Sequence, residues 1–436
     1  MRRRVVITGA GCVTPLGADV ERVWDQLIRG RSGVGRLTLF DASKFPVRIA
    51  AEVHDWDISD VGENPQRWQN HPRQTRFVVA SAMKAYTSSG LEPSRVDPTR
   101  LGVYLGCGET FQDFFQFTRI VHGAIDGDQF QIDRFTQAAL RIWRPDEEAE
   151  LELNMPACHV AAMVNAQGPN ANCIAACASS SQAIGEAAEI IRRDEADLML
   201  SGGAHSMIHP FGLTGFQRLS ALSTRNDDPA GAVRPFDRER DGFVIGEGGA
   251  VLVLEELDHA RRRGAEIWGE ITGFGSSQDA FRLTDSHPEG RGAASSIERA
   301  LDDARLDREE IDYINAHGTG TVVNDKVETI AIKRVFGQRA YSVPISSTKS
   351  MLGHFTTAGG AVEALICLMV LRRSVVPPTI NYESPDPLCD LDYVPNEARS
   401  VDCRHVLSNS FGFGGQNAAL IFSRYDGESA RLPRAA

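Results

Sequence analysis

The feature that most constrains this chain is a recurring unit. A short apolar run ends in a polar or glycine-rich turn and is followed by a segment of helical periodicity. Its clearest instance is NCIAACASSSQAIG, residues 172–185, which we interpret as a strand, a sharp turn bearing Cys177, and a helix. Residues 179–181 are serines, which favour helix starts, and Ile184 and Ile191 recur at roughly helical spacing. Alternating strands and helices of this kind predict an α/β fold.

The unit recurs along the chain. Strands are predicted at 4–9, 101–105, 197–201, 248–255, 267–274, 311–315, 343–347 and 406–410. Helices are predicted at 19–29, 74–90, 293–304 and 361–372. The second part repeats the first in outline, so we predict two similar α/β halves, 1–262 and 263–424, followed by a disordered tail over 425–436. Both halves place reactive residue types just after strand ends, where ligand sites gather in open α/β folds.

Cys177 has two local interpretations. At or just before a helix N-terminus, the unpaired backbone N–H groups would stabilise a thiolate and lower the pKa of the thiol, as a nucleophile requires. Free cysteine is also among the most buried residue types and commonly acts as a small hydrophobe. The local sequence leaves both interpretations open.

Composition excludes several classes of function. The net charge of −12 argues against a nucleic-acid or acidic-membrane partner, although local basic patches remain compatible with it. The eight cysteines contain no Cys-x-x-Cys, so they predict neither a disulfide framework nor a zinc site, and a reduced cytoplasmic setting is expected. No apolar run approaches the roughly 18 residues of a transmembrane helix. GAGCVTPLG at 9–17 resembles a dinucleotide loop only weakly, because Thr14 replaces its third glycine.

Four side chains stand in turns after predicted strands: Cys177, His317, Lys349 and His354. A lone histidine is more often structural than catalytic. Lys349 and His354 lie five residues apart around Gly353, which favours a shaped loop over one helix face. Neutral histidines donating hydrogen bonds suit the stabilisation of an enolate or oxyanion, and a cysteine suits thioester formation.

A set of motifs then carries a family resemblance: VVITGAGCVTPLG, ACASS, STRND, RPFDRERDGFVIGEGG, INAHGTGT, SSTKSMLGH, VPPTIN, CDLDYVP and NSFGFGG. Over essentially its whole length the chain resembles the β-ketoacyl-acyl carrier protein synthases of the thiolase-like superfamily, most closely the elongating synthase II type. The resemblance implies a thiolase-like fold with a layered α-β-α-β-α core. It implies that Cys177 takes the acyl chain and that His317 and His354 form the decarboxylating pair.

The resemblance also implies supporting roles. Backbone N–H groups of Cys177 and Phe413 would form the oxyanion hole, and Phe413 would act as a gate in a glycine-rich loop. Phe411, in the same loop, is either part of this site or core. Lys349 would hold the electrostatics of the site together with Glu363, with a structural ion pair as the alternative.

The implied substrates arrive on acyl carrier protein. Thr319 and Thr321 resemble contacts to its pantetheine arm, and no cofactor or metal of the enzyme's own is expected. Acyl carrier proteins are acidic, so docking requires a local basic patch. Candidates by motif context are Arg67, Arg73, Arg76, Arg218 and Arg225, the alternative being solvated surface arginines.

Departures from the family pattern concern the acyl chain. GCGET at 106–110 places Glu109 where elongating synthases usually have an aliphatic residue, and Phe111 follows it as a second candidate for the acyl pocket. A carboxylate facing an apolar tunnel is costly unless it is paired or redirected. The aromatic-rich segment 109–150 is also longer than expected. It could line an apolar tunnel, contact a second subunit or form ordinary helical core.

The predicted function is decarboxylative condensation of an acyl thioester with malonyl-acyl carrier protein by a homodimer. The nearest alternative is the catalytic subunit of a type II polyketide or polyene synthase, paired with a related chain-length subunit. A thiolase fits less well because the histidine pair suits decarboxylation, and a non-catalytic scaffold fits less well because the cysteine is retained.

Overall fold

The computed structural model describes residues 2–427. A ten-stranded sheet runs through the molecule in the order β12-β11-β15-β16-β10-β1-β9-β8-β4-β7. Its N-terminal strands are β1 (Val5–Val13), β4 (Leu101–Leu105), β7 (Asn170–Asn172), β8 (Leu198–His205) and β9 (Gly248–Glu256). Its C-terminal strands are β10 (Gly269–Gln278), β11 (Tyr313–Asn315), β12 (Ile345–Ser346), β15 (His405–Phe411) and β16 (Gln416–Ser423).

The two halves of this sheet have the same topology. β4 pairs in parallel with β7 and β8, as β11 does with β12 and β15. Two antiparallel strands follow in each half, β9 and β1 in one and β16 and β10 in the other. The halves meet where β1 pairs with β10, at Val6–Glu270 and Ile7–Gly269. This equivalence confirms the predicted pair of similar α/β halves, while the boundary at 262/263 stays a prediction.

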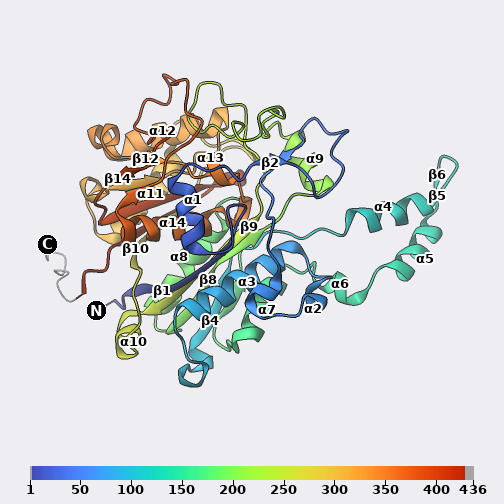
Figure 1. Ribbon diagram of the computed structural model, residues 1–436, viewed down its shortest axis with the longest axis horizontal. Helices are drawn as coiled ribbons and strands as arrows, with labels where there is room; N and C mark the ends of the chain where they lie inside the picture. The colour runs from blue at the N-terminus through green and yellow to red at the C-terminus, as the bar shows by residue number, and fades with distance from the viewer. Residues whose placement is uncertain (1, 428–436) are drawn as a thin grey trace.

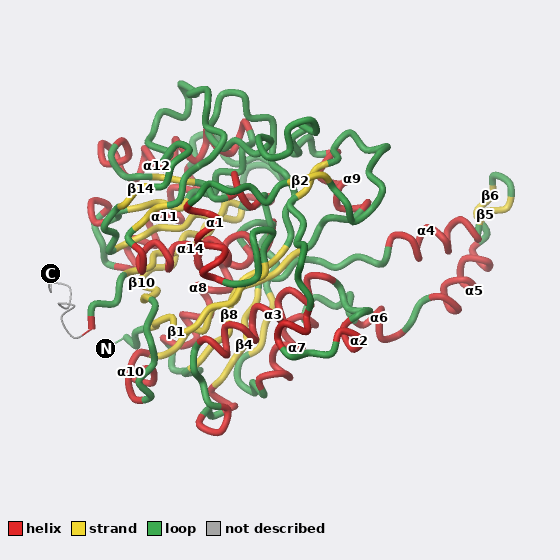
Figure 2. Tube along the Cα trace, in the orientation of Figure 1, coloured by secondary structure: helices red, strands yellow, loops and turns green. Residues whose placement is uncertain are grey.

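Helices form three layers around the strands (Figures 1 and 2). α8 (Ser179–Arg192) and α14 (Gly359–Arg373) pack against each other and against strands of both halves, and so form the central layer. α3 (Arg73–Ser88) and α7 (Met155–Val164) cover the N-terminal half from outside, and α11 (Arg291–Ala304) and α12 (Val322–Phe336) cover the other. α14 is apolar on nearly all sides and buried from Gly359 to Leu371, as a helix enclosed by two sheet halves must be.

Shorter elements connect these layers. The remaining body helices are α1 (Val20–Ile28), α2 (Pro65–Trp68), α9 (Pro210–Arg218), α10 (Leu257–Arg262) and α13 (Lys349–Leu352). Two small ribbons pair β2 (Gly35–Arg36) with β3 (Ile49–Ala50) and β13 (Val375–Val376) with β14 (Arg399–Ser400). Residues 428–436, which make up most of the predicted tail, lie outside the described residues. No helix among the described residues is long and apolar enough to cross a membrane.

The glycines of GAGCVTPLG serve packing, not nucleotide binding. Gly9 and Gly11 lie inside β1 instead of in a turn after it. A side chain at either position would overlap the backbone of α3, at the carbonyl oxygens of Ala85 and Ser81 respectively. The weak dinucleotide interpretation is therefore wrong, because these glycines allow a helix to approach the strand closely.

The aromatic-rich segment forms an arm that extends away from the body (Figures 1 and 2). It consists of α4 (Phe114–Gly123), a ribbon of β5 (Ile125–Asp126) and β6 (Gln129–Phe130), α5 (Ile132–Ile142) and α6 (Pro145–Ala149). α4 and α5 pack on each other and bury Ile120 and Ala124. Seven large apolar side chains of segment 109–153 are exposed: Phe111, Phe115, Ile125, Phe130, Ile132, Leu140 and Leu153. Others are half-buried, among them Phe114, Phe117, Phe135 and Trp143. Ordinary helical core therefore does not describe this segment as a whole, since it buries few of its large apolar side chains.

Candidate active site

Cys177 occupies a tight turn between β7 and α8. Ala176, directly before it, has φ of 46°, a left-handed conformation that non-glycine residues rarely adopt. The Ser179 hydroxyl closes this turn, since it accepts the N–H of Ala175 at 2.7 Å and donates to the Ala176 carbonyl at 2.7 Å. The strand-turn-helix interpretation is confirmed in its turn and helix, and the turn sets the direction of the cysteine side chain.

The other two serines of ACASSS attach the cysteine helix to the C-terminal half. Ser180 Oγ accepts the N–H of Ala361, on α14, at 2.9 Å. The hydroxyls of Ser181 and Ser410, on β15, lie 2.8 Å apart. Both serines are fully buried, so their hydroxyls need these partners. Residues that start a helix locally therefore also fix the cysteine relative to the opposite half.

Both histidines come from the C-terminal half. His317 follows β11, and the Glu328 carboxylate accepts its backbone N–H at 2.8 Å and that of Gly318 at 2.7 Å. The backbone of His354 forms a bridge to the N-terminal half, because its N–H donates to the Val244 carbonyl at 2.8 Å. These bonds hold the two imidazoles in place through the main chain.

The fold brings the cysteine and both histidines together. Nε2 of His354 lies 3.0 Å from Sγ of Cys177. The rings of His317 and His354 are 5.4 Å apart and nearly perpendicular. All three side chains are buried, and their polar atoms lie within 4.8 Å of one another. The cysteine thus forms one reactive centre with two histidines that lie 140 and 177 positions away in the chain.

Lys349 lies behind this centre and forms a buried ion pair with Glu363 of α14. Burial raises the pKa of Glu363 to about 7, even though the lysine charge opposes that rise. The same charge helps to lower the pKa of His317 and of His354. It also opposes the rise in the pKa of the Cys177 thiol that burial causes. One cation therefore acts on every titratable group of the centre.

The protonation states follow from burial. Burial first, and then the charge of Lys349, holds the pKa of both histidines well below the usual 6.5, so each is neutral at pH 7 with one N–H to donate. Burial raises the pKa of Cys177 to about 11. Lys349 and the backbone N–H groups of Phe413 and Cys177 only partly offset this effect. The expected lowering of the thiol pKa is thus wrong, because desolvation outweighs the helix N-terminus.

A cleft of about 520 Å³, partly open to solvent, leads to the sulfur. Thr319, Thr321, Phe411 and Phe413, all named from the sequence, line it. Sequence reasoning missed Phe216, Phe243, Thr284, Ser286, Val323 and Asn324 as further lining residues. Only Phe243 carried a signal, since it lies in the RDGFVIGEGG motif, and its ring packs edge-on against His354 at 5.0 Å.

The two loop phenylalanines differ in their surroundings. Phe413 is half-buried and precedes two glycines in left-handed conformations, Gly414 with φ of 85° and Gly415 with φ of 80°. Phe411 is buried at the end of β15, with its ring 5.8 Å from that of His317. Phe413 therefore lines the cleft beside two glycines, and its role as a gate stays a prediction. Phe411 packs against a histidine from within the core.

The two acyl-pocket candidates lie outside the lining of the cleft. Glu109 is half-buried, and its charge acts on His205 and His209, opposing the lowering of their pKa by burial. Phe111 is 46% exposed, and its ring lies 5.2 Å from that of His209. The charge of Glu109 thus acts on two imidazoles, and the residue is not part of the cleft lining.

The five candidate docking arginines have different surroundings. Arg73 binds the buried carboxylate of Glu247, with Nε and Oε2 2.9 Å apart, and Arg225 donates to the Glu239 carbonyl at 2.7 Å. Burial lowers the pKa of Arg76. The two side chains that are well exposed are Arg67, which has a long contact to Glu63 at 3.4 Å, and Arg218, near the end of α9. Arg67 and Arg218 are therefore the exposed members of the five candidates, and carrier docking by them stays a prediction.

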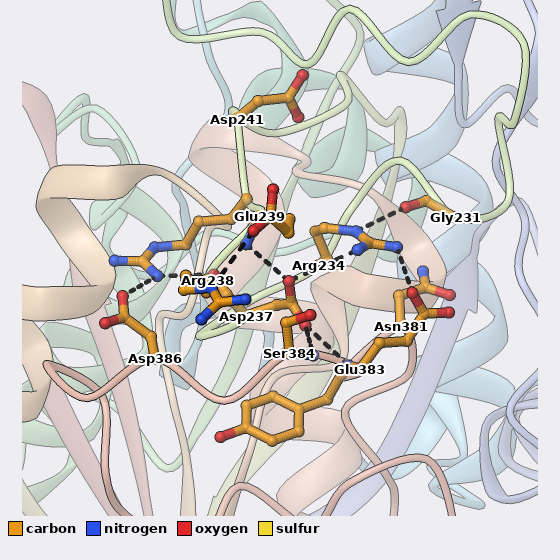
Figure 3. A network of polar contacts seen from close by, with 12 residues as sticks. Gly231, Arg234, Asp237, Arg238, Glu239, Asp241, Asn381, Glu383, Ser384 and Asp386 are labelled. Carbon is orange, nitrogen blue, oxygen red and sulfur yellow. Dashed lines mark hydrogen bonds and ion pairs between the residues drawn. The ribbon is translucent and has the colours of Figure 1, made fainter.

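A polar network holds one loop that borders the cleft (Figure 3). The buried carboxylate of Asp237 accepts the backbone N–H groups of Glu239, Glu383 and Ser384 at 2.8, 2.7 and 2.6 Å. Arg240 adds an ion pair to Asp386 at 2.6 Å. The charged residues of RPFDRERDG thereby join segment 231–241 to segment 381–386, immediately before Phe243 and the cleft.

The fold and this site define a class of protein: thiolase-like enzymes that transfer acyl groups through a cysteine. The chain matches the family described as "Beta-ketoacyl synthase, N-terminal domain" over residues 2–260 and "Beta-ketoacyl synthase, C-terminal domain" over residues 268–383. It belongs to the β-ketoacyl synthase family of condensing acyltransferases.

Relatives of two kinds are equally similar. The 3-oxoacyl-[acyl-carrier-protein] synthase 2 of Coxiella burnetii is 43% identical over 427 residues, 97% of this chain and 99% of the relative. The tetracenomycin polyketide synthase ketoacyl synthase alpha subunit of Streptomyces glaucescens is 43% identical over 425 residues, 97% of either chain.

Solved structures agree with this assignment. The ketosynthase of a type II polyketide synthase, bound to the hexaketide and in complex with its acyl-carrier protein, has a TM-score of 0.87 at 32% identity, covering 98% of this chain and 100% of that one. A β-ketoacyl synthase from Burkholderia phymatum has a TM-score of 0.85 at 35% identity, covering 97% and 100%. The predicted thiolase-like fold is therefore confirmed.

Proposed function

We propose that this enzyme extends an acyl chain carried on Cys177 by decarboxylative condensation with malonyl-acyl carrier protein. The observation that carries the proposal is the convergence of Cys177, His317 and His354, with Nε2 of His354 3.0 Å from the sulfur. The first half, 1–262, supplies the nucleophile and the second, 263–424, supplies the histidines and Lys349. Neither half alone contains the reactive centre.

The first step transfers an acyl group from the pantetheine thioester of a carrier to Sγ of Cys177. A C–S bond forms at the enzyme and the C–S bond to pantetheine breaks. With a thiol pKa of about 11, the sulfur must lose its proton as it attacks. This proton leaves on the departing pantetheine sulfur, and His354, whose Nε2 lies at the sulfur of Cys177, is neutral before and after the step. The backbone N–H groups of Cys177 and Phe413 stabilise the oxyanion that develops on the acyl carbonyl.

The second step uses the histidines as donors. The malonyl thioester oxygen accepts N–H groups of His317 and His354, and loss of carbon dioxide places the enolate charge on that oxygen. The enolate carbon attacks the acyl thioester, the C–S bond to Cys177 breaks, and the β-ketoacyl product leaves on its carrier. Neutral imidazoles suit this role, because they donate hydrogen bonds without being acidic enough to protonate the enolate carbon.

Acyl carrier protein supplies the phosphopantetheine, so the enzyme needs no cofactor of its own. The arm of the carrier would enter the cleft beside Thr319 and Thr321, past Phe413. We assign docking of the acidic carrier to Arg67 and Arg218, the exposed members of the five candidate arginines. We also propose a cytoplasmic setting, which agrees with eight cysteines that are all free.

The exposed arm supports a dimer. Its exposed apolar side chains, among them Phe115, Phe130, Ile132 and Leu140, are of the kind that a second chain covers. That chain is either a second copy, giving a homodimer, or a related chain-length subunit, giving a heterodimer. The second candidate is supported by the likeness to the ishigamide ketosynthase/chain length factor, with a TM-score of 0.85 at 34% identity. The 43% identity to the ketoacyl synthase alpha subunit does not choose between the two, because the synthase 2 relative is equally similar.

One experiment tests this function. Purified enzyme is supplied with acyl- and radiolabelled malonyl-acyl carrier protein, and carbon dioxide release and β-ketoacyl product are both measured. Release in step with product supports condensation and argues against a thiolase. Condensation that persists in Cys177→Ser would overturn the proposed mechanism. Activity that requires co-expression of a similar-sized chain would replace the homodimer with the heterodimer.

A further inference from the structure

A second cluster of histidine and carboxylate side chains lies outside the reactive centre. It consists of His71, in the loop between α2 and α3, His159 on α7, and Glu150, directly after α6. The ligand atoms of the three lie within 4.8 Å of one another. The residues are 79 and 9 positions apart in sequence, so folding, and not a local motif, assembles them.

The distances in this cluster are close to those of a metal site. Nε2 of His159 lies 2.8 Å from Oε1 of Glu150, and Nε2 of His71 lies 3.7 Å from the same oxygen. In a tetrahedral zinc site with bonds of about 2.0–2.1 Å, adjacent ligand atoms are separated by about 3.3 Å. The two nitrogen–oxygen distances thus differ from this separation by about half an ångström each, and all three ligand atoms lie within 4.8 Å of one another.

The cluster also contains polar atoms that lack partners among the described residues. Glu150 is 5% exposed, and its Oε2 is buried without a hydrogen bond. Nδ1 of His71 is buried without one as well. A buried carboxylate with one unsatisfied oxygen is costly, and an ion is one of the few groups that explain it.

The surroundings keep the histidines in place. Trp68 is 1% exposed, its ring centre lies 4.7 Å from that of His71 and 5.3 Å from that of His159, and its Nε1 donates to Glu63 at 2.9 Å. The His71 and His159 side chains are 20% and 19% exposed, which leaves a path for an ion and a fourth ligand from solvent.

We propose that His71, Glu150 and His159 form a binding site for a divalent first-row transition-metal ion such as Zn²⁺, with water as the fourth ligand. Two imidazoles and a carboxylate match the preference of such ions for nitrogen and oxygen ligands. This site is independent of the condensation reaction and lies apart from Cys177.

The position of the site suggests its effect. The Thr110 hydroxyl donates to the carbonyl of Glu150 at 3.2 Å, so the two ends of the arm meet at this cluster. Gln74, three residues after His71, donates to the Gly108 carbonyl at 2.8 Å. An ion held by Glu150 and two body histidines would therefore fasten the base of the arm to α7 and to the start of α3.

The test must separate this site from the reactive centre, whose cysteine and histidines could also bind zinc. Zn²⁺ is therefore titrated calorimetrically into metal-free Cys177→Ala enzyme and into Cys177→Ala/His159→Gln. We expect the first to bind about one ion per chain and the second to bind it at least about 100-fold more weakly, because loss of a direct ligand costs no less than loss of its hydrogen-bond partner. Equal binding by the two variants, or no binding by the first at micromolar Zn²⁺, would overturn the proposal.

A second measurement avoids dependence on one variant. Co²⁺ bound to Cys177→Ala enzyme should show the visible absorption of a tetrahedral ion, and His71→Gln should abolish it while circular dichroism shows an unchanged fold. Amide hydrogen exchange over residues 110–154 should slow on adding Zn²⁺ in the Cys177→Ala enzyme but not in the His159→Gln variant. Exchange that responds equally in both would remove the proposed link between the ion and the arm.

Discussion

Replacement of Lys349 by methionine tests how the buried charges of the site work together. The substitution removes the cation and leaves the Glu363 carboxylate, 3% exposed, without its partner. Breaking a buried ion pair by removing one member costs about 3–5 kcal/mol of unfolding free energy. Activity should fall by about 100-fold or more, because the same charge acts on the pKa of the thiol and of both histidines.

The double variant Lys349→Met/Glu363→Leu separates stability from catalysis. Apolar residues of similar volume replace a buried pair at little cost, so this variant should recover most of the lost stability. It should remain as inactive as Lys349→Met, since the cation is still absent. Urea unfolding and carbon dioxide release from malonyl-acyl carrier protein measure the two effects.

The pH dependence of stability gives an independent check on the buried state of Glu363. Glu363 has a pKa of about 7 in the folded protein, against an ordinary 4.5, so the folded state holds this proton more tightly than the unfolded chain. The stability that protonated Glu363 contributes is fully present below pH 4.5 and is lost as the pH rises through 7. The difference between the two pKa values corresponds to a decline of about 3 kcal/mol in the free energy of unfolding. Glu363→Gln should flatten this decline.

Two results would refute the reasoning. Recovery of activity in the double variant would show that Lys349 serves only to neutralise Glu363. Wild-type stability of Lys349→Met at pH 8 would show that the pair has no structural role.

Four further substitutions test other parts of the proposal. Cys177→Ala should leave no acyl group on the chain by intact-mass spectrometry, and a retained acyl group would place the nucleophile elsewhere. Arg218→Glu should raise KM for acyl carrier protein at unchanged kcat, with an effect that shrinks in high salt; salt-independent loss would indicate a structural role. Leu140→Asp, at an 83% exposed position of the arm, should yield monomers in sedimentation velocity, whereas an intact dimer would show that the arm is dispensable. Glu109→Ile should leave acyl preference unchanged in competition assays, because Glu109 lies outside the cleft lining, and a shifted product distribution would return Glu109 to the acyl pocket.

Much of the fold followed from local patterns. The strand at 101–105 was predicted with its observed bounds, and the helix at 293–304 began two residues after its observed start. Elsewhere strands were longer than predicted, as β1 continues through Gly9 and Gly11 to Val13. The pattern of apolar residues shows where a strand is buried, but glycines within it suggest a turn until the helix that packs on them is known. Strand β16, Gln416–Ser423, was also missed, although it contains no glycine.

For the site, the sequence determined the residue types and their turns: the cysteine before a serine-rich helix start, and histidines after strand ends. Only the tertiary structure decided their distances and protonation, because the pKa of Cys177 depends on burial and on Lys349, 172 positions away in the chain. Long-range contacts also pair Arg73 with Glu247 and bring His71 close to Glu150 and His159. Local periodicity reports which face of an element is buried. Electrostatic environment and ligand geometry arise from residues that meet only when both halves have packed.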